Sequence, residues 1–185
     1  MIAVMSELME ELEPMLCSEV SVPAGGSLFH VGDKVERLFA VRSGCVHLVR
    51  FGEDGRAAVM QRATAGTLLA ESSVFSAVYH CDAVAVEATS LACADIGAVR
   101  ARLATNPALT AALARHLAGE VHRMRVRVEV LSQRTVRDRL AAWLALVPGG
   151  LPAPGRLRAV AEDLGVSPEA LYRELARRRA AAPEP

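Results

Sequence analysis

The chain has 185 residues, of which 52% are hydrophobic, enough to bury a sizeable core and to argue against wholesale disorder. Its 21 basic and 21 acidic residues give a formal net charge of zero, so overall charge does not indicate nucleic-acid binding. No uninterrupted apolar run is long enough to predict a membrane span. The acidic N-terminal residues Glu7, Glu10 and Glu11 are untypical of a signal peptide, so we expect a cytoplasmic protein without a membrane partner.

The first hundred residues predict a helix followed by strands. Ser6–Leu16 can form the opening helix, with Ser6 as its N-cap. Short alternating or β-branched runs then recur, separated by turn signals such as Glu53-Asp54-Gly55, and this pattern is typical of an all-β barrel or sandwich. The predicted strands are Ser27–Val31, Leu38–Arg42, Val46–Phe51, Ala57–Ala63, Ala83–Glu87 and Ser90–Ile96.

A long helix is predicted from Asn106-Pro107 to about Leu131, because proline suits the first turn of a helix. Its apolar positions follow a 4-3-4-3 spacing, which is that of a coiled-coil seam. The stripe could pack on its own domain, but its length and heptad spacing favour a homodimer interface. The predicted dimerisation residues are Leu117, Val121, Met124, Val128 and Leu131.

The C-terminal part predicts three more helices. Arg134–Val147 forms one, and the Pro- and Gly-rich segment from Pro148 to Gly155 ends it. Leu157–Leu164 and Glu169–Arg178 form the other two, with Gly165 in the turn and Ser167 and Pro168 at the start of the last helix.

The last two predicted helices have the spacing of a DNA-binding helix-turn-helix. Ala161 provides a small residue where the helices cross, Gly165 suits the turn, and Leu171 is buried. An ordinary pair of packed helices remains the alternative. Serine, glutamate and arginine side chains on the second helix could contact phosphates and base edges. The predicted DNA-binding residues are Ser167, Glu169, Ala170, Tyr172, Arg173 and Arg177.

The whole chain resembles the Crp–Fnr family of transcriptional regulators. The resemblance is carried by Phe29–Asp33, Leu38–Val49, Glu53–Arg56, Ala65-Gly66, Ala70-Glu71, Ala94–Ile96 and the helix beginning Arg134-Thr-Val-Arg-Asp-Arg-Leu. It implies an α+β chain with three parts: an N-terminal double-stranded β-helix (a β-roll of the cyclic-nucleotide-binding type) over residues 1–104, a dimerisation helix over 105–133, and a small all-α helix-turn-helix domain over 134–185. It also implies contact with double-stranded DNA and with RNA polymerase.

Three departures from the family bear on function. Cys81 stands where cyclic-nucleotide binders of the family have the arginine that holds the phosphate, and Asp82 replaces the hydroxyl residue beside it. Tight cyclic AMP binding is therefore not expected. Cys17 lacks the cysteine partners that an iron–sulfur cluster requires. Finally, the chain ends soon after the predicted recognition helix, without a clear β-hairpin wing, and Pro168 occupies the position of a base-reading arginine.

The sequence allows three alternatives for the effector. The pocket that the resemblance implies would include Gly66, Glu71, Ser72, His80, Cys81 and Asp82. His80 and Cys81 could ligate a haem iron, as in the carbon-monoxide-sensing relative, or Cys81 could act as a redox thiol. A pocket without any small ligand is the third alternative.

The sequence thus predicts a homodimeric DNA-binding regulator of the Crp–Fnr type, with an effector other than tightly bound cyclic AMP or with none. The alternative is a dimeric sensor or interaction protein of the same family that has lost sequence-specific DNA binding. An enzyme is not expected, because the sequence contains no phosphate-binding glycine loop and no nucleophile motif. No confident metal site is predicted, and His30, His47, His116 and His122 are interpreted as surface or packing residues.

Overall fold

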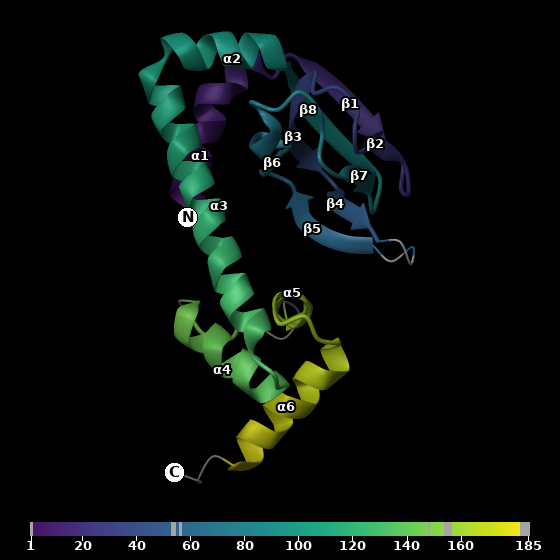
Figure 1. Ribbon diagram of the computed structural model, residues 1–185, viewed down its shortest axis with the longest axis vertical. Coiled ribbons are helices and arrows are strands. Elements are labelled where there is room, and N and C mark those ends of the chain that lie inside the picture. The colour runs from purple at the N-terminus through teal and green to yellow at the C-terminus, as the bar shows by residue number, and fades with distance from the viewer. Residues whose placement is uncertain (1, 53–54, 56, 148, 154–156, 182–185) are drawn as a thin grey trace. The chain divides into compact units, whose positions relative to one another are not determined.

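A computed structural model describes residues 2–52, 55, 57–147, 149–153 and 157–181, with side chains from Glu7 onward. Figure 1 labels the helices and strands along the chain. The chain divides into two compact units, Met1–Leu117 and Ala118–Pro185, and the boundary falls within one long helix. Each unit has its own hydrophobic core.

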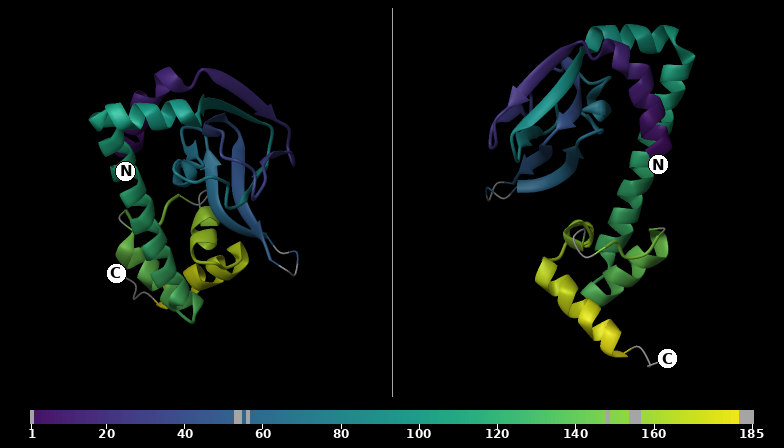
Figure 2. Two further views of the ribbon diagram at one scale, coloured as in Figure 1. Left: turned by 45° about the horizontal axis from the view of Figure 1, so that its top comes forward. Right: turned by 180° about the vertical axis from the view of Figure 1, so that it is seen from behind.

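The first unit is built on two antiparallel sheets that face each other (Figure 2). One sheet has the order β1-β8-β3-β6 and the other β2-β7-β4-β5. The strands are β1 (Ser18–Val22), β2 (Ser27–Phe29), β3 (Arg37–Ser43), β4 (Cys45–Phe51), β5 (Ala57–Thr64), β6 (Leu68–Leu69), β7 (Asp82–Ala85) and β8 (Thr89–Asp95). This arrangement is the predicted β-roll, which is confirmed.

The chain passes from one sheet to the other at Gly44, between β3 and β4. Gly44 has φ +85°, and a Cβ at this position would lie 2.6 Å from the Ala88 carbonyl oxygen and 2.4 Å from Thr89 Oγ1. Glycine is required here because any side chain would collide with the turn before β8. Gly44 therefore allows the chain to cross from one sheet to the other.

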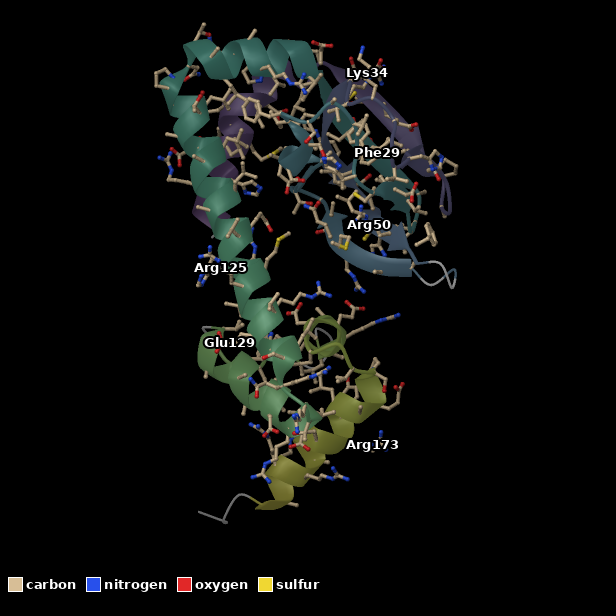
Figure 3. The ribbon with its side chains drawn as sticks, viewed as in Figure 1. Phe29, Lys34, Arg50, Arg125, Glu129 and Arg173 are labelled. Carbon is tan, nitrogen blue, oxygen red and sulfur yellow. The ribbon has the colours of Figure 1, made fainter. Side chains whose placement is uncertain are left out.

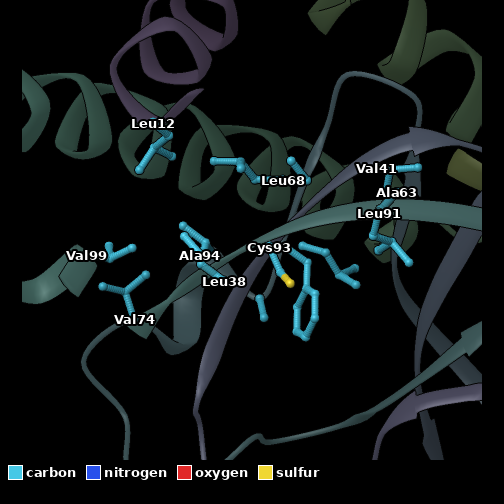
Figure 4. Close-up of a cluster of buried hydrophobic side chains, with 14 of the residues drawn as sticks. Leu12, Leu38, Val41, Ala63, Leu68, Val74, Leu91, Cys93, Ala94 and Val99 are labelled. Atoms are coloured by element: carbon cyan, nitrogen blue, oxygen red, sulfur yellow. The ribbon is translucent and has the colours of Figure 1, made fainter. Parts of the chain in front are cut away.

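The core of this unit lies between the two sheets and the helices that border them (Figure 4). Buried positions alternate along strands such as β4, in which Val46 and Leu48 are buried and His47 is partly exposed, as expected for strands with one face in the core. Phe29 stacks on Tyr79 with ring centroids 3.8 Å apart, and the Tyr79 hydroxyl donates to the Arg37 carbonyl oxygen at 2.8 Å. The aromatic pair is therefore buried, and its tyrosine hydroxyl has a hydrogen-bond partner.

Several predicted bounds in this unit are wrong. The opening helix α1 spans Ile2–Leu12 and is followed by the short helix η1 (Glu13–Met15), so Ser6 lies inside the helix and is not its cap. Strand β1 was not predicted, although it pairs with β8 over its whole length. It was missed because the run is short and its pairing partner, β8, is distant in sequence. The predicted hairpin turn at Glu53-Asp54 lies outside the described residues.

Helices complete the first unit. The helix α2 (Ile96–Thr105) begins directly after β8, where the Asp95 carboxylate accepts a hydrogen bond from the Ala98 amide. The long helix α3 (Pro107–Ser132) follows, as predicted, and Asn106 accepts hydrogen bonds from the amides of Ala108 and Leu109 at its start. Such side-chain caps satisfy amides that have no partner within the helix. A third element, the short helix η2 (Glu71–Ser73), follows β6.

The second unit consists of the end of α3 and three further helices. These are α4 (Val136–Leu146), α5 (Leu157–Asp163) and α6 (Pro168–Ala181). Val130 of α3, Leu140 and Trp143 of α4, Val160 and Ala161 of α5, and Leu171 of α6 form a separate buried core. The helix predicted at Arg134–Val147 starts at Val136, because Thr135 caps it by accepting from the Asp138 amide at 3.1 Å. Among the described residues, no helix is both long and apolar enough to cross a membrane.

Candidate functional site

The turn between α5 and α6 has the local structure that its sequence predicts. Gly165 adopts φ +62°, and its amide donates to the Glu162 carbonyl oxygen at 3.1 Å. The Val166 amide donates to the Ala161 carbonyl oxygen at 2.9 Å, which closes the end of α5. Ala161 is fully buried where the two helices pack, so a larger side chain at this position would separate them.

The start of α6 is fixed by Ser167 and Pro168. The Ser167 hydroxyl accepts a hydrogen bond from the Ala170 amide at 3.2 Å, and Pro168 is the first helical residue. This is the predicted N-cap. Leu171 is fully buried and Leu175 almost so, and both pack into the core of the second unit. One side of α6 is therefore anchored.

Helix α4 supports the same turn through Arg139. Its guanidinium donates to the Leu164 carbonyl oxygen at 3.0 Å and to the Gln133 carbonyl oxygen at 2.9 Å. The Trp143 indole nitrogen also donates to the Asp163 carboxylate at 3.3 Å. Charged and aromatic groups of α4 thus hold the end of α5 and the turn in one arrangement.

The opposite side of α6 faces solvent. Of the residues predicted to bind DNA, Ser167, Glu169, Tyr172, Arg173 and Arg177 are exposed, whereas Ala170 is half-buried. Figure 3 shows Arg173 among the side chains of α6. Hydrogen bonds from its own backbone amide and from the Ser167 hydroxyl, together with the charge of Arg173, lower the pKa of the Glu169 carboxyl. This face therefore carries an ionised carboxylate next to arginine.

The arginines at the end of α6 are not equivalent. The Arg178 guanidinium lies 3.6 Å from the buried Glu174 carboxylate and donates to the Arg137 carbonyl oxygen, so it is engaged within the unit. Arg177 also approaches Glu174, at 3.9 Å, but its side chain is 79% exposed. Arg177 can therefore contact a ligand at little cost, whereas Arg178 serves the fold.

Along α3, the predicted dimerisation residues separate into two groups. Val121, Met124 and Val128 are exposed, and they line a shallow surface groove together with Arg125 and Glu129 (Figure 3). Leu117 instead packs against the core of the first unit. The Leu131 side chain reaches the Gly165 turn, where its Cδ2 lies 2.7 Å from the position a Cβ would take. Leu131 is still 36% exposed, so Val121, Met124 and Val128 are the most exposed part of the apolar stripe.

The residues of the predicted effector pocket have different environments. Glu71 is buried in η2, and the preceding Ala70 has φ +67°, a conformation that costs an L-residue roughly 1–2 kcal/mol. Ser72 is exposed. Gly66 lies in the turn before β6, and its amide donates to the Val41 carbonyl oxygen. Glu71 therefore offers a buried carboxylate, whereas Gly66 and Ser72 lie at the surface.

Around β7, the predicted residues already have protein partners. The Asp82 carboxylate accepts from the Val31 amide and pairs with His30 Nδ1, each at 3.1 Å. His80 is exposed and its Nε2 lies 3.2 Å from Ser76 Oγ. Cys81 is half-buried, and burial followed by the charge of Asp82 raises the pKa of its thiol. A raised pKa disfavours the thiolate that both haem ligation and redox chemistry need.

One residue that the sequence interpretation treated as packing has a more specific position. His116 is 4% exposed, and its Nε2 lies 3.8 Å from Glu71 Oε1. Gln61 reaches the same carboxylate oxygen with its side-chain amide at 3.3 Å. The helical period of buried positions Leu109, Ala112, Leu113 and His116 was the signal that could have placed His116 on the inner face of α3.

Comparisons with known proteins agree with this architecture. Residues 19–106 match the cyclic nucleotide-binding domain family, which is most of the first unit. The Catabolite Activator Protein of Thermus thermophilus is 27% identical, with a TM-score of 0.58 over 97% of this chain and 91% of that one. The resemblance to the Crp–Fnr family is confirmed.

Two further solved structures are similar to this chain. The N-terminal domain of a transcriptional regulator from Streptomyces coelicolor A3(2) is 29% identical, with a TM-score of 0.50, and covers 70% of this chain and 88% of that one. FixK2 from Bradyrhizobium japonicum is 19% identical, with a TM-score of 0.66 over 89% of this chain and 85% of that one, and supports the fold alone. A comparison with curated proteins finds no match. Of these structures, the one from Streptomyces coelicolor is described as part of a transcriptional regulator.

The turn geometry predicts opposite effects for two glycine-to-alanine substitutions. Gly165→Ala is expected to destabilise the chain by roughly 1–2 kcal/mol, because φ +62° disfavours an L-residue and the new methyl would press on Leu131. Gly119→Ala, inside α3 with only Arg123 Nη1 at 3.7 Å, is expected to stabilise it by about 0.5–1 kcal/mol. Urea unfolding of both variants measures the difference. Equal stabilities would contradict the turn described here.

Proposed function

We propose that this chain is a homodimeric DNA-binding transcriptional regulator in which α6 is the recognition helix. One observation carries the proposal: α6 is buried on one side in the core of its unit and presents Glu169, Tyr172 and Arg173 to solvent on the other. A helix that follows a tight turn and offers arginine and glutamate from its first turns matches the way helix-turn-helix proteins read the major groove.

The chemistry of that face suits direct base recognition. Arg173 can donate two hydrogen bonds to the O6 and N7 atoms of guanine, and the ionised Glu169 can accept one from the amino group of cytosine. Arg177 and the Ser167 hydroxyl suit phosphate contacts, which position a protein on DNA without specifying sequence. These roles depend on exposed groups, and the described structure leaves the Arg173 and Glu169 side chains exposed.

The DNA-binding proposal is tested with Arg173→Ala. Loss of a bidentate contact is expected to weaken specific binding by about 1–3 kcal/mol, a factor of roughly 5–150, and to relax base preference at one position. Arg102→Ala is the matched control, since Arg102 is an exposed arginine at the end of α2 in the other unit. Gel shifts with the DNA upstream of the protein's own gene measure both. If dimeric wild-type protein gives no shift even at low salt, a dimeric sensor without DNA binding is the better assignment.

A homodimer is proposed through the uncovered stripe of α3. Val121, Met124 and Val128 are 46%, 57% and 69% exposed, and they repeat at i, i+3 and i+7 on one face. The inner face of the same segment, at Val126 and Val130, packs into the core of the second unit, so the exposed stripe is not needed for that packing. Burying such a side chain fully stabilises by roughly 1.5–3 kcal/mol, which a second copy of the helix would provide.

Val128→Arg tests this interface. The charge is expected to shift the chain from twice its monomer mass to the monomer mass in sedimentation equilibrium at micromolar concentration, because an arginine in the seam would be buried without a partner. Leu151→Arg is the control, since Leu151 is also an exposed apolar residue of the second unit, at 40%. A dimer that persists in Val128→Arg but dissociates in Leu151→Arg would contradict the proposal.

We further propose that cyclic AMP is not the tightly bound effector. Cys81 occupies the place of the family's phosphate-binding arginine, and Asp82 adds a carboxylate held by His30 and the Val31 amide. An anionic phosphate would lose its main charge partner there and approach a like charge. RNA polymerase is a further expected partner, by analogy with the family.

Calorimetric titration tests the cyclic AMP proposal. The wild-type chain is expected to show no binding at micromolar nucleotide, whereas the double variant Cys81→Arg, Asp82→Ser is expected to bind more tightly because it restores the cation and removes the carboxylate. Micromolar or tighter binding by the wild type would overturn the proposal.

A further inference from the structure

The first unit buries a carboxylate and an imidazole side by side. Glu71 in η2 is 5% exposed and His116 in α3 is 4% exposed, and Glu71 Oε1 lies 3.8 Å from His116 Nε2. That distance is too long for a hydrogen bond, for which 2.7–3.2 Å is typical. The two groups therefore approach each other without a direct hydrogen bond.

The Glu71 carboxylate is incompletely satisfied. Oε1 accepts from the Gln61 side-chain amide at 3.3 Å, but the buried Oε2 has no hydrogen-bond partner among the described residues. A buried carboxylate is normally paired or bound to a metal ion, because desolvation of an uncompensated charge is costly. A cation bound between this oxygen and the neighbouring imidazole would compensate the buried charge.

A third potential ligand follows on the same helix. Glu120 lies one turn after His116, and residues four apart on an α-helix occupy the same face. Its carboxylate also pairs with Arg123, three residues further on. A carboxylate can accept at several positions, so this ion pair leaves capacity for a further contact. His116 and Glu120 therefore form a helical pair of the kind that binds metal ions from one face.

We propose that Glu71, His116 and Glu120 bind a divalent transition-metal ion, with Zn²⁺ as the favoured occupant. One imidazole and two carboxylates suit zinc and its first-row neighbours, and water would complete the coordination. Two donors of one tetrahedral ion stand about 3.3 Å apart when each bond is about 2.0–2.1 Å. The ion would therefore fit if Glu71 Oε1 and His116 Nε2 moved about half an ångström closer together.

Other titratable groups nearby fit less well. The Asp82 carboxylate and His30 already pair with each other, and Asp82 also accepts from the Val31 amide. The raised pKa of the Cys81 thiol works against thiolate ligation. The proposed ion would connect η2 with the first half of α3, and it would provide an input signal located in the β-roll. Metal binding at this site does not require DNA binding. A negative zinc titration would therefore leave the DNA-binding proposal intact, and a negative gel shift would leave the metal site intact.

Zinc binding to the purified, chelator-treated full chain tests the proposal. Calorimetry is expected to show one Zn²⁺ per chain with micromolar or tighter affinity, and zinc should raise Tm. Glu71→Gln and His116→Gln should each weaken binding by about tenfold or more and abolish the shift in Tm. His122→Gln is the matched control, since His122 is an exposed histidine on the same helix, and it should bind as the wild type does.

Cobalt provides a second measurement. Co²⁺ should give d–d absorption without a thiolate charge-transfer band, and Zn²⁺ should remove the absorption. Circular dichroism shows whether His116→Gln folds. If it does not, Glu120→Gln replaces it in the titration, and this variant should also bind zinc more weakly than the wild type. The proposal is overturned if the wild type does not bind zinc, if the Glu71 variant binds as tightly as the wild type, or if the cobalt spectrum indicates cysteine ligation.

Discussion

The long helix α3 has one face that packs within its own chain and another that is exposed. The rest of the structure depends on this division. A helix repeats its surface every 3.6 residues, so α3 can bury one stripe in its own chain and leave another uncovered. In its first half, Leu109, Leu113 and His116 belong to the buried stripe. In its second half, Val126 and Val130 pack inward while Met124 and Val128 remain exposed. The predicted effector domain, the predicted dimer interface and the predicted DNA-binding unit each include part of α3.

This division assigns each part of the chain a physical role. The first unit supplies a β-roll in which a buried and incompletely satisfied carboxylate, Glu71, lies beside an imidazole of α3. The second unit supplies a rigid turn, held by Arg139 and Gly165, that sets the direction of α6. A ligand at Glu71 and a recognition face at Arg173 would then be connected through the same helix. Any coupling between them would require that α3 have two arrangements of different affinity for DNA.

Much of the fold follows from local patterns. Turn glycines, β-branched runs and capping residues predicted most strands and the long helix, because these signals act within a few residues. The start of α6 was predicted from Ser167 and Pro168, and the structure confirms it. Strand β1 and the two-residue β6 were missed because their pairing partners are distant in sequence, and the bounds of α1 were wrong because Ser6 is only one of several polar residues in that segment.

The candidate sites were less predictable, because they depend on contacts between distant residues. The resemblance placed Glu71 in the effector pocket, but nothing local indicated that His116 would lie beside it, 45 positions later. The heptad spacing predicted a seam, yet it could not show that Leu117 and Leu131 also contact residues of their own chain. Likewise, Arg177 and Arg178 look alike in sequence. Both approach Glu174 in the structure, but Arg178 also donates to the Arg137 carbonyl oxygen, whereas the Arg177 side chain is 79% exposed.

In the proposed dimer, two copies of α6 present their exposed faces to DNA across a two-fold axis. The sharpest test is selection of bound sequences from a random pool of duplex DNA, because it requires neither a known operator nor a known promoter. We expect enrichment of inverted half-sites whose centres lie about one helical turn apart, roughly 34–36 Å. Failure to enrich any sequence, or enrichment of a single half-site without symmetry, would rule out such a dimer.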